Sequence, residues 1–374
     1  MKKSIIFYIH SITGLLSGVF ILLMSLSGAV LIFHEELDSF QLPTIYPKQN
    51  SITTVDRCYQ YILTKYPNAQ ISHCLIPEIS HKPVSFFIYD LSFKKGQEKM
   101  ELLLHPQSAQ IIKTRGVRND IQNNLMSWLS TFHNSFHLYK TGEFLLGFFS
   151  FVFLLSIITG IIHFRKKILS VLLFNKAVYK KNNLHQLIGV YALLFNMMIA
   201  LTGLWMQRYV FKKEFYAIDN YTQTLKASTS LSFNFNKAYS NIQKKYPEFT
   251  AHVIYFAQSS KSKTALYGSF AGNAYVHSKN MADVIYLDSA GGVAKTRFIN
   301  DIDVADRYDI INSQLHMGRF GGLGIKIIYF IFGLSGGLLS IIGFLMWRRR
   351  NNISKVFKHS SHKISLTIFI TILP

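Results

Sequence analysis

Four histidines occupy positions that repeat along this sequence, and imidazole is a common ligand for metals in proteins. His10 and His185 are each followed by glycine four and eighteen residues later: Gly14 and Gly28 after His10, Gly189 and Gly203 after His185. His133 and His316 each precede a glycine by 27 residues. These matching offsets predict that the chain is an internal duplication in which each pair of histidines serves one purpose.

The histidines lie at the ends of long apolar segments. The chain has 374 residues, of which 49% are hydrophobic and only 16% charged. The apolar residues gather in four blocks, roughly Ile9 to Phe33, Phe144 to Phe164, Leu184 to Met206 and Leu323 to Trp347. Each block is close to the ~20 residues with which a helix crosses a bilayer. The sequence therefore predicts a polytopic membrane protein with a four-helix core, embedded in the lipid bilayer.

The apolar blocks divide the chain into eight parts. We predict transmembrane helices over 1–34, 133–167, 184–207 and 316–350, with His133 and His316 opening the second and fourth helices. The two long segments between predicted helices, 35–132 and 208–315, are each predicted to form a module outside the helices. Residues 168–183 form a loop, and 351–374 are a tail or the start of a truncated helix.

Basic residues flank the apolar blocks on one side. Lys2 and Lys3, the run at 165–167 and the arginines at 348–350 all fall on the same side if four spans alternate. Positive flanks face the cytoplasm, so we expect both termini in the cytoplasm and both modules on the outer side of the membrane. The net charge of +21 then reflects topology, and nucleic-acid binding is not expected.

The two outer segments have the same pattern. Each begins with a helical period that ends in Lys-Tyr-Pro, continues with strand-like alternation and closes on Lys-Thr-Arg, at 113–115 and 295–297. One helix against a small antiparallel sheet is the simplest fold for each. The predicted fold class is thus an α-helical integral membrane protein with two small α+β extracytoplasmic modules.

The histidine stripes admit two interpretations. On a helix, offsets of four and eighteen return to nearly the same face, so glycine and histidine share one stripe. Small residues allow close helix packing, with histidine hydrogen-bonding across the interface. Alternatively, a flat cofactor lies on the glycines while histidine binds its metal, because ionisable side chains within spans usually mark function.

The kind of metal site is narrowed by the ligands present. Histidines from facing helices are the usual axial ligands of a b-type haem, and the absence of Cys-x-x-Cys-His excludes covalent haem attachment. Zinc normally takes a tighter cluster. His133 and His137 have the i, i+4 spacing of such a cluster, so a small-metal site there remains an alternative.

The sequence resembles the PepSY-associated transmembrane proteins, which include iron-regulated inner-membrane ferric-siderophore reductases. The resemblance covers nearly the whole chain and rests on four segments: "IHSITGLLSGVFILLMSLSGAVLIFHEEL", "FHNSFHLYKTGEFLLGFFSFVFLLSIITGIIHFRKK", "LHQLIGVYALLFNMMIALTGLW" and "QLHMGRFGGLGIKIIYFIFGLSGGLLSIIGFLMWRRR". It implies extracytoplasmic PepSY modules and, as in the reductase members, two b haems. Carried over by position, the haem ligands would be His10, His133, His185 and His316.

The resemblance implies an electron-transfer function. The expected activity is that of a membrane oxidoreductase, which reduces a ferric siderophore or other ferric chelate in the periplasm during iron acquisition. No flavodoxin-like or NAD(P)H-binding domain is recognised, so the electron donor, cytoplasmic or quinol, stays open. The alternative is a non-enzymatic PepSY scaffold or peptidase regulator whose histidines only pack helices.

Other residues have weaker assignments. His137, His163 and His34 are secondary ligand candidates, although for the last two we prefer contact with lipid headgroups to ligation. Cys58 and Cys74 lie in the first outer module, where an oxidising compartment permits a disulfide; the alternative is two buried thiols. Arg115, Arg118 and Arg319 are candidates to contact an anionic chelate or to anchor the chain at the membrane interface. No catalytic residue is assigned.

Overall fold

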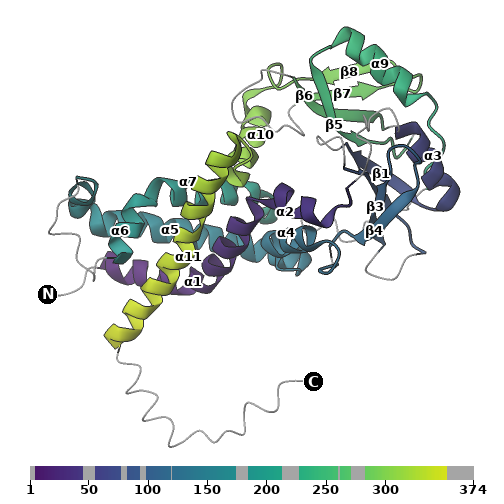
Figure 1. The fold of residues 1–374 in the computed structure, drawn as a ribbon. Coiled ribbons are helices and arrows are strands. Elements are labelled where there is room, and N and C mark those ends of the chain that lie inside the picture. The colour runs from purple at the N-terminus through teal and green to yellow at the C-terminus, as the bar shows by residue number, and fades with distance from the viewer. Residues whose placement is uncertain are drawn as a thin grey trace, which may run out of the picture. The chain divides into compact units, whose positions relative to one another are not determined.

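The computed structural model describes residues 5–44, 55–76, 82–92, 98–118, 120–173, 184–212, 227–259, 262–270 and 283–351 (Figure 1). The chain divides into two compact units. The first contains residues up to 29, residues 147–204 and residues from 330 onwards. The second contains residues 30–146 and 205–329. Several helices begin in one unit and end in the other.

Long apolar helices build the first unit. Three of them, α1 (Ile5–Leu31), α5 (Tyr139–Leu172) and α11 (Gly322–Asn351), are long and apolar enough to cross a membrane. A fourth span is possible if α6 (Leu184–Tyr191) and α7 (Leu193–Met206) count as one. The segment 184–207, predicted as one transmembrane helix, consists of α6 and α7 with a bend of 64° between them.

Polar side chains join these helices to one another. Ser25 of α1 donates a hydrogen bond to the carbonyl of Gly333 and accepts one of 2.9 Å from the backbone N–H of Gly337, both in α11. Asn196 of α7 donates to Ser335 Oγ at 3.0 Å. Such bonds stabilise helix association in lipid by about 0.6–2 kcal/mol each.

The second unit is built on one antiparallel sheet. Its eight strands run in the order β4-β3-β2-β1-β5-β6-β7-β8. The first four are β1 (Gln70–Leu75), β2 (Val84–Tyr89), β3 (Lys99–Leu104) and β4 (Ile111–Gly116). The last four are β5 (Phe249–Tyr255), β6 (Thr264–Phe270), β7 (Asp283–Leu287) and β8 (Val293–Arg297). The two modules expected from the sequence therefore share a single sheet.

The two groups of four strands meet at β1 and β5. His73 pairs with Tyr255, Cys74 with Ile254 and Leu75 with Val253, which places an approximate twofold axis through the Cys74–Ile254 pair. Each group is an antiparallel meander with an irregularity before its last pairing, at Leu103/Leu104 and at Tyr286/Leu287. The strand register therefore relates positions of one group to positions of the other.

Helices α3 (Val55–Lys65) and α9 (Phe235–Lys245) cover one face of the sheet. Their apolar sides pack with alternate strand residues into one core, which includes Ile62, Phe86, Ile242 and Leu266. The two helices also touch each other. The Asp56 carboxylate of α3 accepts hydrogen bonds from the first backbone N–H groups of α9, at 2.9 and 3.0 Å, and so satisfies donors that a helix start leaves unpaired.

The remaining helices of the second unit are α2 (His34–Gln41), α4 (Leu125–Ser135), α10 (Val304–Met317) and the 3₁₀ turn η4 (Arg208–Phe211). The expectation that His133 and His316 open the second and fourth spans is wrong, because they lie in the last turns of α4 and α10. The chain reverses before α5 through left-handed residues Phe136 and His137, and before α11 through Gly318, Gly321 and Gly322.

The two cysteines are fully buried, Cys58 in α3 and Cys74 in β1, and no disulfide joins them. Burial raises the pKa of the Cys74 thiol well above its usual value, and the neighbouring Cys58 adds to the effect. A buried neutral thiol reacts slowly, since the thiolate is the nucleophile.

We therefore expect both cysteines to resist maleimide in the native protein and both to react after unfolding without reductant. Mass spectrometry would count two adducts per chain in the unfolded sample and none in the native one. A need for reductant before either cysteine reacts would show that the pair is oxidised in the cell.

Candidate functional site

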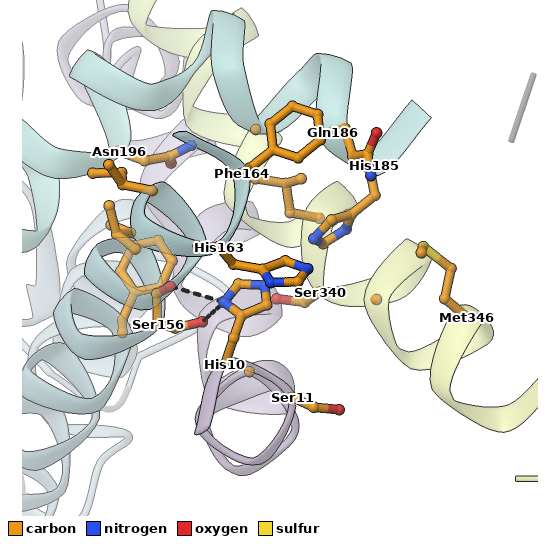
Figure 2. A pocket seen from close by; sticks show the side chains of 18 of the residues that line it. His10, Ser11, Ser156, His163, Phe164, His185, Gln186, Asn196, Ser340 and Met346 are labelled. Carbon is orange, nitrogen blue, oxygen red and sulfur yellow. Dashed lines mark hydrogen bonds between the residues drawn. The ribbon is translucent and has the colours of Figure 1, made fainter. Parts of the chain in front are cut away.

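A cavity of about 260 Å³ lies among the helices of the first unit (Figure 2). His10 of α1 and His185 of α6 both line it, and their ring centres are 6.2 Å apart. The rings meet nearly edge to face, at 68°. The rest of the lining is mainly apolar and aromatic, including Phe153 and Phe164 of α5 and Trp347 of α11.

The His10 ring is held by the neighbouring helix. Its Nδ1 atom lies 2.9 Å from the carbonyl oxygen of Ser156, an acceptor only, so Nδ1 carries the proton (Figure 2). The neutral ring then keeps its Nε2 lone pair for another partner, the arrangement usual for a metal ligand. Nδ1 of His185 is buried and has no hydrogen-bond partner among the described residues.

Glycines make room for both rings. A Cβ atom on Gly160 of α5 would stand 3.1 Å from Cε1 of His10, and one on Gly343 of α11 would stand 3.4 Å from Cε1 of His185. These are the glycines that follow His133 and His316 by 27 residues. Sequence reasoning used them only as markers of the repeat; their shared offset was the signal for a role beside the histidines.

Only some of the other residues in the His10 and His185 stripes line the cavity. Gly14 and Gly189 line the cavity, whereas Gly28 and Gly203 lie near the ends of α1 and α7 and are not part of its described lining. His163 of α5 does line it, with its ring centre 5.5 Å from that of Phe7. Three histidines therefore face one cavity.

His133 and His316 form a second pair, which lies in the second unit. The ring centres of His133 and His316 are 6.5 Å apart, with planes inclined by 48°. Burial, together with the neighbouring His316, lowers the pKa of His133 to about 3, and burial lowers the pKa of His316 to about 4. Both imidazoles are thus neutral at neutral pH, the form that binds metals.

His137 and His34 lie outside this pair. His137 is in the reversal after α4, its ring packs against Trp128 at 4.8 Å, and its buried Nε2 has no hydrogen-bond partner among the described residues. His34 begins α2, and burial lowers its pKa. The described residues contain no group of three or more His, Cys, Asp or Glu that could hold a metal ion, so no observation supports a zinc cluster at His133 and His137.

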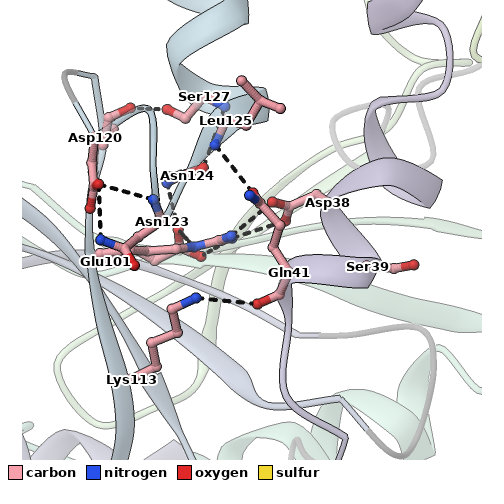
Figure 3. A network of polar contacts seen from close by, with 12 residues as sticks. Asp38, Ser39, Gln41, Glu101, Lys113, Asp120, Asn123, Asn124, Leu125 and Ser127 are labelled. Atoms are coloured by element: carbon pink, nitrogen blue, oxygen red, sulfur yellow. Dashed lines mark hydrogen bonds and ion pairs between the residues drawn. The ribbon is translucent and has the colours of Figure 1, made fainter.

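A buried ion network positions the helix that carries His133 (Figure 3). Arg115 of β4 forms bidentate bonds with Asp38 of α2, at 2.7 and 2.9 Å, and with Glu101 of β3, at 2.7 and 3.1 Å. Asn124 caps α4 and donates to Glu101. Arg115 is only 4% exposed, so its interpretation as a contact for a chelate is wrong.

Arg115→Leu is expected to destabilise the second unit by about 3–5 kcal/mol, because it leaves two buried carboxylates without their cation. Chemical denaturation of the detergent-solubilised protein, followed by tryptophan fluorescence, would measure the loss. Arg118→Leu is the control, since Arg118 is exposed and its replacement is expected to cost less than about 0.5 kcal/mol. Equal stability of the two variants would contradict a structural role for Arg115.

Long apolar helices combined with an antiparallel sheet unit define a membrane protein with a folded polar part. A profile described as the PepSY-associated TM region matches residues 7–350, and the chain therefore belongs to the PepSY-associated transmembrane family. No curated protein matches the sequence.

Proposed function

We propose that the protein is a haem-containing electron-transfer protein of the bacterial inner membrane that reduces ferric chelates in the periplasm. The observation that carries the proposal is the arrangement of the four histidines as two facing pairs, with ring centres 6.2 and 6.5 Å apart. A metal bonded to one nitrogen of each ring, at the ~2 Å usual for imidazole, holds the ring centres roughly 6 Å apart.

The residues around the first pair also fit a haem. The hydrogen bond to Ser156 leaves Nε2 of His10 unprotonated, and Nδ1 of His185 is a buried polar atom without a described partner. The lining is mainly apolar and aromatic, with small residues beside each ring. Such surroundings suit the flat hydrophobic face of a porphyrin better than a hydrated ion.

A b-type haem held by two imidazoles supplies one-electron transfer without an open iron position. The four histidines, all partly buried, would hold two such groups. The chemistry proposed for the substrate is reduction of Fe(III) to Fe(II) by one electron. Hard oxygen ligands hold Fe(III) more tightly than Fe(II), so this step lets a siderophore release its iron.

The proposed orientation follows from the basic flanks of the spans. We infer that both termini face the cytoplasm, that the His10–His185 pair lies toward the cytoplasm and that the sheet unit is periplasmic. The electron donor would then be a cytoplasmic protein or a membrane quinol. A reporter fused after Lys181 should be active only in the cytoplasm, and periplasmic activity of that fusion would contradict this orientation.

The proposal includes an internal duplication with a four-helix core. Both halves of the chain have the element order helix, four strands, short helix, long helix. Gly160 beside His10 and Gly343 beside His185 occupy equivalent positions in the two even-numbered spans. Two copies related by a twofold axis would place each histidine opposite its counterpart in the other copy. Each such pair could then supply the two ligands of one haem.

A redox spectrum tests the proposed function directly. The purified chain, reduced with dithionite, should show the Soret and α bands of b-type haem, and pyridine haemochrome analysis should give two haems per chain. Protein that is folded and monodisperse but shows neither band would overturn the proposal. The histidines would then act in helix packing, as in a PepSY scaffold or peptidase regulator.

A further inference from the structure

The face of the sheet opposite α3 and α9, here called the second face, carries one continuous row of paired residues. Strand register places eight side chains side by side across all eight strands: Arg115, Glu101, Phe87, His73, Tyr255, Ala265, Tyr286 and Lys295. The middle of this row is aromatic and its ends are charged.

Aromatic rings stack along the centre of the row. The His73 ring lies parallel to Phe87 at 4.3 Å and close to Tyr255 at 5.0 Å, and Tyr255 meets Tyr267 at 5.0 Å. Burial, with Lys99 nearby, lowers the pKa of His73 to about 4, so the stack is uncharged at neutral pH. All four rings keep part of their surface accessible.

The approximate twofold axis relates Arg115 to Arg297. In the first group, Arg115 pairs across strands with Glu101; in the second, Arg297 pairs with Val284. The second group therefore has an apolar residue, Val284, at the position of Glu101, the carboxylate that pairs with Arg115. The adjacent carboxylate of β7, Asp283, projects to the other face by strand alternation and accepts a hydrogen bond from Ile299 N.

Arg297 consequently differs from its counterpart. Its Nε is buried and has no hydrogen-bond partner among the described residues, and no described acidic side chain forms an ion pair with it. An uncompensated buried donor on a cation is costly, which favours an anion bound at that point. Glu101 and Asp38, on the first side of the sheet, both form ion pairs with Arg115.

The surroundings of Arg297 define what kind of anion fits. Tyr267 stands in the same cross-strand row as Arg297, and Arg297 and Tyr286 both act on the Tyr267 phenol, whose pKa is raised mainly by burial. Lys295 lies opposite Tyr286. The equivalents of Tyr286 and Tyr267 in the first group are Leu103 and Phe87, so among the described strand residues the second group alone combines these phenols with an unneutralised arginine.

We propose that Arg297, with Tyr267, Tyr286 and the adjoining stack, forms a binding site for an anionic aromatic chelate of the catecholate type. Arg297 would bind the oxyanion edge by charge-assisted hydrogen bonds, and the rings would stack on the aryl groups. This inference rests on the proposed function, because it names the class of ferric chelate that the protein would reduce.

Equilibrium binding to the oxidised full chain in detergent tests the site without any electron transfer. The probe is the ferric complex of 2,3-dihydroxybenzoate, followed by quenching of intrinsic fluorescence, with ferric acetohydroxamate as the non-aromatic comparison. Arg297→Gln should raise the Kd of the catecholate complex at least about tenfold, the size expected for one charge-assisted bond of about 1.5 kcal/mol. Lys244→Gln, an exposed lysine of α9 on the other face, should change it less than about twofold.

A second variant tests the twofold argument itself. Val284→Glu supplies Arg297 with the carboxylate that Arg115 has in Glu101, so it should abolish catecholate binding while the fold is retained. If Arg297→Gln does not yield monodisperse protein, Tyr286→Leu, which installs the residue found at Leu103, should weaken binding in its place. Wild-type affinity in Val284→Glu and in either of the other variants would overturn the site. Binding that depends on Arg297 in a protein without haem bands would instead overturn the proposed function and leave the site standing.

Discussion

Under the proposed function, replacing His185 with alanine is expected to remove one of two haems and to stop electron transfer across the membrane. In the proposed site His10 and His185 would together hold one haem, so the variant would keep only one of its two ligands. Haem content should fall from two to one per chain. Transfer from a reductant inside proteoliposomes to a ferric chelate outside should fall by more than about 100-fold, beyond the range typical of outer-shell changes.

Gln186→Ala is the matched control, because Gln186 lines the same cavity one residue away. This variant should keep both haems and most of the activity. The second haem of His185→Ala should still be reduced by dithionite added from outside. If His185→Ala retains two haems with unchanged spectra, the proposed pairing is wrong, and His163, which faces the same cavity, becomes the candidate ligand.

Replacing His316 with alanine is expected to remove the other haem and to block delivery to the chelate while the first haem remains reducible. The reason is the pairing with His133, whose ring centre lies 6.5 Å away. Pyridine haemochrome analysis should again give one haem per chain. Stopped-flow reduction should show electrons reaching the first haem and stopping there.

His137→Ala is the informative comparison for this second pair. His137 lies in the reversal after α4, and its ring packs on Trp128 rather than in the His133–His316 pair. We expect His137→Ala to keep both haems. Loss of a haem in His137→Ala, together with its retention in His316→Ala, would move the ligand role from His316 to His137.

Local patterns in the sequence predict much of this architecture. The apolar blocks locate α1, α5 and α11, and the end-to-end resemblance to PepSY-associated proteins agrees with the family match over residues 7–350. The alternation after each Lys-Tyr-Pro predicts the strands, and equal offsets predict that His10 and His185 face each other. These features depend on residue periodicity over short distances.

The features that sequence reasoning missed have other physical origins. The reversal before α5 uses left-handed Phe136 and His137; histidine is a type enriched in this conformation, but phenylalanine gives no signal for it. The reversal before α11 contains Gly318, where φ is +63°, and that glycine was a usable signal. The ion network of Arg115 joins residues up to 77 positions apart, and such pairing leaves no local pattern.

The joining of β1 to β5 has a consequence for how the chain is made. His73 and Tyr255 pair directly, so strand β1 leaves the ribosome long before the strand that covers its edge. At 5–20 residues per second, the intervening chain takes on the order of 10–40 s to synthesise. During that interval β1 is an uncovered edge that can pair with any extended segment, including the β1 of a second nascent chain. Productive biogenesis therefore needs β1 to be shielded until translation reaches β5.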